Sequence, residues 1–202
     1  ESRGLGDVYK RQELAMVLVD RGADIHVGDD GEITPLHEAC YGGNMELVMA
    51  LLNMGANIHA RDEFQRTPLH EACINGHMEL VMALVDRRGA DVDARDIDQL
   101  TPLHHTCDEG HMDVAMALVD RGANIHARDD HGKTPLHYAC DFGNMDVVMV
   151  LVDRGADVNA RDEFQRTPLD YLRMEENRNR LKSMINRNVG NVMNSMIDSV
   201  ET

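Results

Sequence analysis

The sequence lacks tryptophan, and aromatic residues of all kinds make up only 3% of its 202 residues. Hydrophobic residues still reach 43%, so the chain can bury a core, and we expect that core to be aliphatic. No apolar run of about 20 residues occurs, so a transmembrane helix is not expected. The basic, apolar and small-residue regions of a secretory signal are missing from the first residues as well.

Basic residues are also scarce, because 20 lysines and arginines face 36 acidic residues and leave a net charge of −16. Nucleic-acid binding needs clustered lysine and arginine to neutralise phosphates, and an acidic chain is repelled by anionic membrane surfaces. The composition therefore argues against a nucleic-acid partner and against membrane insertion. From residue 168 onward five acids and five bases cancel, so the excess negative charge lies before that residue.

A short motif recurs at a nearly fixed period. Thr-Pro-Leu-His starts at Thr34, Thr67, Thr101 and Thr134, and Thr-Pro-Leu-Asp starts at Thr167. The spacings are 33, 34, 33 and 33, and the extra residue comes from the Arg87-Arg88 pair. A fixed period of this length predicts an array of repeated structural units.

Each unit has the pattern of two short helices joined by a turn. In the unit that begins at Thr67, the threonine can cap a helix whose first position is Pro68, and Asn75-Gly76 can end that helix. A second apolar stripe predicts a helix from Met78 to about Asp86, ended by Gly89. Neither helix is long enough to be stable alone, so the units must stack and bury each other's apolar faces.

The motif TPLHEAC, the second-helix pattern MELVMALV and the tails GANIHARD and GADVNARD resemble the ankyrin-repeat family. The resemblance covers roughly residues 12 to 172. It implies an all-α solenoid of stacked helix-turn-helix units with projecting β-turn or hairpin loops. Two family positions differ: cysteine replaces the usual second alanine of the first helix, and Glu38, Glu71, His105 or Tyr138 replaces the usual leucine after the histidine.

The repeat register also predicts the boundaries. Residues 1–11 (ESRGLGDVYKR) fit no part of the repeat and are interpreted as a non-native or disordered leader. Residues 12–187 form the predicted array, with a partial unit at 12–33, full units at 34–66, 67–100, 101–133 and 134–166, and a polar cap at 167–187. For the tail at 188–202, one more helix and a frayed end are both open.

Histidine and cysteine recur in His-x-x-Cys pairs, which could suit a metal. These pairs are His37/Cys40, His70/Cys73, His104/Cys107 and His137/Cys140. Stacked units lie about 10 Å apart, so their side chains cannot converge within about 2.3 Å of one ion, nor within the limit of about 7 Å between the Cα atoms of a disulfide. The resemblance implies that the histidine bonds to its own threonine and to nearby backbone. The cysteine is expected to pack as a small hydrophobic residue.

No catalytic pattern or phosphate-binding motif is present, so neither an enzyme nor a cofactor is predicted. Unpaired buried thiols favour a reducing compartment, which indicates the cytoplasm, or alternatively the nucleus. The first methionine series can pack between successive second helices or form an adaptable partner surface: Met16, Met49, Met82, Met116 and Met149. The second series is assigned to the core: Met45, Met78, Met112 and Met145.

Specific function is expected where the units differ, at the turn tips and on the first helices. The candidate partner-binding residues are Tyr41, Phe64, Arg66, Ile74, Ile97, Leu100, Asp108, Tyr138, Phe142 and Phe164. Exposed aromatic residues are typical of interface hot spots, and the neighbouring acids would favour a basic partner. The acids concerned are Glu71, Asp108, Glu109 and Asp141.

These features predict a scaffold that binds a basic segment of a protein partner on the concave first-helix and loop-tip face. The alternative is a regulatory or targeting module of a larger protein whose other domain carries an enzymatic or channel activity, which the intact transcript would decide. A further hypothesis is that Asn159 resembles the asparagine that hydroxylases modify in ankyrin repeats.

Overall fold

The computed structural model of the chain describes residue 22 and residues 24–198, with side chains to residue 187. In that part of the chain every regular element is a helix. The predicted leader at 1–11 lies outside the described residues, and so do the first ten residues of the partial unit. The side chains of the predicted tail, 188–202, lie outside them as well.

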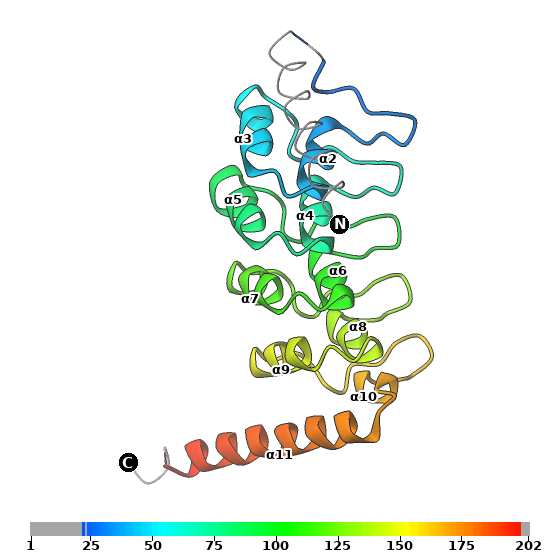
Figure 1. Cartoon of the computed structure of the whole chain (residues 1–202). Helices are drawn as coiled ribbons and strands as arrows, with labels where there is room; N and C mark the ends of the chain where they lie inside the picture. Colours follow the sequence, from blue (N-terminus) through cyan, green and yellow to red (C-terminus); the bar gives the residue numbers. More distant parts are fainter. Residues whose placement is uncertain (1–21, 23, 199–202) are drawn as a thin grey trace, which may run out of the picture. The chain divides into compact units, whose positions relative to one another are not determined.

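The chain divides into two compact units, Glu1–Pro102 and Leu103–Thr202, each described here by itself. The described helices of the first unit are α2 (Pro35–Tyr41), α3 (Met45–Asn53), α4 (Pro68–Ile74) and α5 (Met78–Arg88). Helix α2 packs against α3 of its own repeat and against α4 of the next repeat, and α4 packs against α5 (Figure 1). Each repeat is therefore a helix-turn-helix pair followed by a projecting loop.

The second unit continues the pattern and ends in a longer helix. Its helices are α6 (Pro102–Glu109, entering the unit at its second residue), α7 (Met112–Asp120), α8 (Pro135–Asp141), α9 (Met145–Asp153), α10 (Pro168–Tyr171) and α11 (Glu175–Asp198). Helix α8 packs against α9 and α10, while α9 packs against α7 and α11. The 24 residues of α11 run through the boundary predicted between residues 187 and 188.

The recurring threonine and histidine start the first helix of each repeat. In α8 the Thr134 amide lies 3.0 Å from Nδ1 of His137 and donates to it, while the Thr134 side chain accepts a bond from the His137 backbone. Because Nδ1 accepts a backbone N–H, the proton of the neutral ring is on Nε2, which donates to the Arg166 carbonyl at 3.2 Å. His37 makes the same bonds to Thr34 and Arg66. This confirms the role that the family resemblance implied.

Glycine ends the helices where the backbone becomes left-handed. Gly89 has a φ of 70° and caps α5 as predicted, although the helix runs to Arg88, two residues beyond the expected end. Gly43, after α2, has a φ of 68°, and a Cβ added there would lie 2.6 Å from the ring of His77 in the next repeat. The His77 ring uses this space to bond the Tyr41 carbonyl at 2.9 Å.

The core is aliphatic and contains the cysteines. Leu36, Leu69, Leu103 and Leu136, at one position of successive first helices, are at most 1% exposed. All four cysteines are free and buried, as predicted. Burial raises the pKa of the Cys140 thiol to about 12, which keeps it protonated and unreactive at neutral pH.

The two methionine series differ in how deeply the structure buries them. The described members of the first series, at the centre of the second helices, are half-buried: Met49, Met82, Met116 and Met149. The assignment of the second series to the core is wrong for Met112, which is 37% exposed, whereas Met145 is buried. Met45 and Met78 are half-buried. All four residues are the first of their helices, and the burial of this position differs from one repeat to the next.

Candidate functional site

A buried aspartate shapes the loop between consecutive repeats. In the first unit an Asp62 carboxylate oxygen accepts the backbone amides of Phe64 and Arg66, at 3.0 and 2.7 Å. The Asp62 amide in turn donates to the Arg66 carbonyl at 3.1 Å, which closes a hairpin turn. Gln65 has a φ of 60° at the tip. The carboxylate therefore fixes the position from which Phe64 projects.

An arginine joins each turn to the turn of the next repeat. Nη1 of Arg61 donates to the carbonyls of Gln65 and Arg95, both at 2.6 Å. The amide of Ile97 also donates to the Phe64 carbonyl at 2.8 Å. Arg128 makes the equivalent pair of bonds in the second unit. Neighbouring turn tips within a unit are therefore held side by side.

Three of the predicted partner-binding residues meet in one cleft of the first unit. Tyr41, Phe64 and Arg66 line a space of about 210 Å³ that we call the Tyr41–Phe64 cleft. Its other lining residues are Ile33, His37, Glu38, Asp62 and Glu71. Tyr41 is 57% exposed and Phe64 is 46% exposed, so both present apolar surface to a ligand.

Arg66 already has contacts within this cleft. Its guanidinium lies 4.8 Å from the centre of the Phe64 ring. Its Nη1 atom is 3.4 Å from Glu71, and its Nε atom is 3.5 Å from Asp62. The side chain thus orients Phe64 and neutralises part of the acidic wall. Glu71 is correspondingly less available to a basic partner than the sequence suggested.

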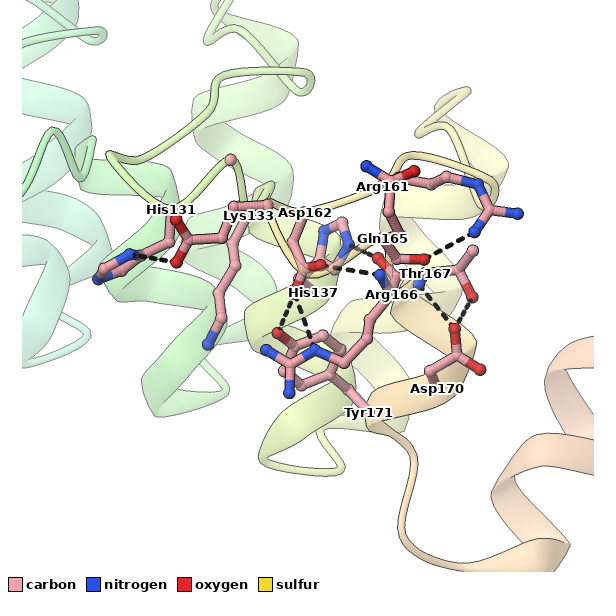
Figure 2. Close-up of polar contacts among 12 residues, drawn as sticks. His131, Lys133, His137, Arg161, Asp162, Gln165, Arg166, Thr167, Asp170 and Tyr171 are labelled. Atoms are coloured by element: carbon pink, nitrogen blue, oxygen red, sulfur yellow. Dashed lines mark hydrogen bonds and ion pairs between the residues drawn. The ribbon is translucent and has the colours of Figure 1, made fainter.

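The second unit has a different cluster at the equivalent place, shown in Figure 2. The Tyr171 hydroxyl donates to the Asp162 carboxylate, and the ring stands edge-on to His137 at 5.5 Å. The Lys133 ammonium and the Arg166 guanidinium lie 4.8 and 4.6 Å from the centre of the same ring. Tyr171 was not among the residues predicted from the sequence, although it has the same position in its repeat as Tyr138.

These bonds set the protonation of the pair. Burial alone would raise the pKa of Asp162, but hydrogen bonds from Tyr171 and Arg166 together outweigh it and lower the pKa to about 2. Burial and the adjacent carboxylate raise the pKa of Tyr171 above its usual value. Asp162 is therefore ionised and Tyr171 neutral across the physiological range.

Tyr138 is packed more closely than the sequence suggested. Its hydroxyl donates to the Asp129 carboxylate at 2.8 Å, and its ring lies edge-on to His104 at 5.6 Å. Burial, followed by the bond to Asp129, raises its pKa. Tyr138 is half-buried, so it stabilises the second unit and exposes little ring surface to a partner.

Phe164 and Phe142, by contrast, are the most exposed phenylalanines, at 64% and 61%. Phe164 lies under the Arg166 guanidinium at 4.7 Å, as Phe64 does under Arg66. Phe142 lines a separate space of about 440 Å³ with Arg173 and Met174. Sequence analysis assigned no role to these last two residues.

The remaining candidates are distributed over both units. Ile97 is 57% exposed at a turn tip, whereas Ile74 and Leu100 are half-buried. Asp108 is half-buried, and its pKa is raised by burial and by the negative charge of Glu109. Asp141 is paired with Arg173 at 3.1 Å, so its charge is less available than the sequence suggested.

No group of three or more histidine, cysteine or acidic side chains is arranged to hold a metal ion in the part of the chain that the structure describes. Among the helices of residues 24–198, none combines the length and the apolar character that crossing a membrane requires.

The repeated capping box, the helix pairs and the projecting turns can now be compared with known proteins. A family model described as "Ankyrin repeats (3 copies)" matches residues 8–96 and 89–162. The chain belongs to the ankyrin-repeat family. A search of the curated proteins found no match. Ankyrin repeats are in general protein–protein interaction modules, so this family membership supports a protein partner and leaves its identity to the residues that vary between repeats.

Proposed function

We propose that this ankyrin-repeat protein is an interaction scaffold that binds a basic segment of a partner protein through its turn tips and first helices. The observation that carries the proposal is the placement of the chain's aromatic residues. All three phenylalanines, together with Tyr41, are 46–64% exposed on these turns and at the ends of the first helices. Aromatic residues held in fixed positions are efficient contact residues, because they lose little conformational entropy on binding.

Charge supports a basic partner. The net charge of −16 would accelerate the approach of a cationic segment, and the association rate should fall as salt rises. Exposed acids precede two of the phenylalanines in the sequence, Glu63 before Phe64 and Glu163 before Phe164, and Glu163 also pairs with His131 at 2.8 Å. Phe64 and Phe164 each have an arginine over one ring face, so a partner is expected to contact the other face and the adjacent carboxylate.

A binding experiment with matched variants tests the proposal. An array of basic peptides, with acidic peptides of equal length, is screened against the full chain, and the affinity of each hit is measured for Phe64→Ala and Phe142→Ala. We expect at least one variant to weaken binding by about tenfold or more, the effect of a hot spot. Met54→Ala is the control, because Met54 is 48% exposed but follows α3, away from the turn tips. Equal losses for Met54→Ala and for the phenylalanine variants would contradict the proposal.

The same scaffold is expected to act in a reducing compartment. Its four thiols are free and buried, which is typical of proteins of the cytoplasm or the nucleus. Asn159 is exposed, and it is the backbone N–H of this residue that donates to Asp157. Its hydroxylation stays a prediction, which mass spectrometry of the native protein would test.

A further inference from the structure

The two units contain the same loop sequence, but a different residue follows it two positions later, Glu71 in the first unit and Tyr171 in the second. Residues 61–69 and 161–169 are both RDEFQRTPL, and the chains first diverge at His70 and Asp170, followed by Glu71 and Tyr171. The Phe64–Arg66 and Phe164–Arg166 contacts are alike, at 4.8 and 4.7 Å. The second unit therefore serves as a template for how a phenol ring can bind beside the identical loop of the first unit.

In the second unit Tyr171 has four contacts of three kinds. Its hydroxyl donates to a buried carboxylate, its edge meets a histidine ring, and two cationic groups lie over its faces. The residues that make these contacts are Asp162, His137, Arg166 and Lys133. Three of them have an identical counterpart in the first unit, in Asp62, His37 and Arg66, all of which line the Tyr41–Phe64 cleft.

In the first unit Glu71 has the position of Tyr171 and carries no ring. Its carboxylate instead pairs with Arg66, at 3.4 Å, and the space beside it is the cleft of about 210 Å³. An apolar cavity of about 150 Å³ in a protein core is known to bind benzene, so this space is large enough for a phenol. In the second unit the Oδ2 atom of Asp162 accepts from both the Tyr171 hydroxyl and Arg166 Nε, so the equivalent atom of Asp62, 3.5 Å from Arg66 Nε, has the same capacity to accept from a phenol.

Three other lining positions also differ between the units, since Ile33, Glu38 and Tyr41 correspond to Lys133, Tyr138 and Asp141. Lys133 supplies a cation over the Tyr171 ring, whereas the equivalent residue in the first unit is the uncharged Ile33. Glu38 and Glu71 line the same cleft. A ligand that brings both the phenol and an adjacent basic residue would restore the contacts found in the second unit and balance these acids.

We infer that the Tyr41–Phe64 cleft receives a tyrosine side chain of the partner protein, next to a basic residue, in the way that the second unit receives its own Tyr171. The tyrosine hydroxyl donates to Asp62, and the ring lies between His37 and Arg66. This inference rests on the proposed function, because it names the residue that the scaffold recognises in its partner.

A peptide titration of the full chain tests this inference. The probe is acetyl-Lys-Tyr-Lys-amide, observed through ¹³C-labelled isoleucine methyl groups by NMR, with analogues that carry phenylalanine or alanine in place of tyrosine. The methyl signal of Ile33 should shift and saturate with the tyrosine peptide, while that of Ile125 in the second unit should stay unchanged. Loss of the bond to an ionised carboxylate should weaken the phenylalanine peptide by about tenfold or more, and the alanine peptide should not shift Ile33. Equal affinity of the tyrosine and phenylalanine peptides overturns the inference.

Two variants at one position separate the ring from the charge. Glu71→Tyr places in the cleft the residue that the second unit already has, so it should abolish the shift of Ile33. Glu71→Gln removes the charge and leaves the cleft open, so it should bind the tyrosine peptide within about threefold of the unmodified chain. Full binding by Glu71→Tyr, with native circular dichroism, overturns the inference, as does complete loss in Glu71→Gln. If Glu71→Tyr fails to fold, the comparison of the three peptides still decides.

The outcomes also separate this inference from the proposed function. If basic peptides of the array bind the unmodified chain but the tyrosine probe does not shift Ile33, the scaffold function stands and the tyrosine cleft is wrong. If only the short tyrosine probe binds and every basic peptide of the array fails, the cleft stands and the basic-partner proposal is wrong.

Discussion

The histidines of the capping boxes should make the protein less stable as the pH falls through about 6.5. His37 and His137 are each 1% exposed or less, and burial lowers the pKa of both in the folded state. In each ring Nδ1 accepts a backbone amide of the preceding threonine, so a proton at that atom would break the box. The unfolded chain has no such restriction and binds a proton near the usual pKa of about 6.5.

The magnitude follows from proton linkage. Between the unfolded and the folded pKa, the unfolded state binds more protons, so the free energy of unfolding decreases as pH falls. Each histidine with a lowered pKa contributes a slope of at most about 1.4 kcal/mol per pH unit, and the two together at most about 2.8. Above pH 6.5 their contribution is fully present, and below the folded pKa the slope disappears.

Urea unfolding followed by circular dichroism between pH 8 and pH 5 measures this slope. The variant His137→Asn removes one titrating ring while its amide oxygen can still accept the Thr134 amide. The variant should be less stable at pH 8, since it loses the bond to the Arg166 carbonyl, but its stability should fall less steeply below pH 6.5. Acidification also reduces the repulsion within a chain of net charge −16, and the difference between the two proteins removes that effect. Identical slopes for both would refute the reasoning.

Three further perturbations follow from the same contacts. Tyr171→Phe removes the hydroxyl bond to Asp162, so it should lower the free energy of unfolding by about 1.5–3 kcal/mol, measured by urea unfolding. It should also raise the pKa of Asp162 above its value of about 2 in an NMR titration, and an unchanged pKa would contradict the role of this bond. Gln165→Gly should stabilise the protein by about 0.5–1 kcal/mol, because Gln165 has a φ of 62° where the equivalent Gly132 has 74°, and a lower urea midpoint would contradict this. The four cysteines should not react with a thiol reagent at pH 8 until urea unfolds the chain, because all are buried, and labelling of the folded protein would disprove that packing.

The period and the local chemistry of the repeat made most of the fold predictable. Thr67, Pro68 and Gly89 act through bonds and dihedral angles within a few residues, so their roles could be read directly from the sequence. Met112 was assigned wrongly because apolar spacing alone does not show how far the next repeat extends over the start of a helix. The length of helix α11 was not predicted, because its polar residues depart from the repeat motif that defined the other helices.

The candidate site was predictable in composition and less so in geometry. Tyr41, Phe64 and Arg66 were all expected to contact a partner, but their meeting in one cleft depends on how consecutive repeats stack. Tyr138 was expected to be exposed, whereas its hydroxyl is bonded to the carboxylate of Asp129, nine residues earlier, and its ring packs against His104 of the preceding first helix. Tyr171 was overlooked because the cap departs from the repeat motif, although its position after Thr-Pro-Leu-Asp indicated the same place as Tyr138.

The guanidinium groups of Arg61 and Arg128 have a consequence for how such loops can diversify. Each spans from the tip of its own turn to the first residues of the following one, at 2.6–2.7 Å. An insertion of even one residue into a tip would move one carbonyl out of reach and release the adjoining loop as well. New specificities at these positions are therefore expected to arise by exchanging side chains at constant loop length, which makes substitution libraries more suitable than lengthened loops for redirecting this protein to other targets.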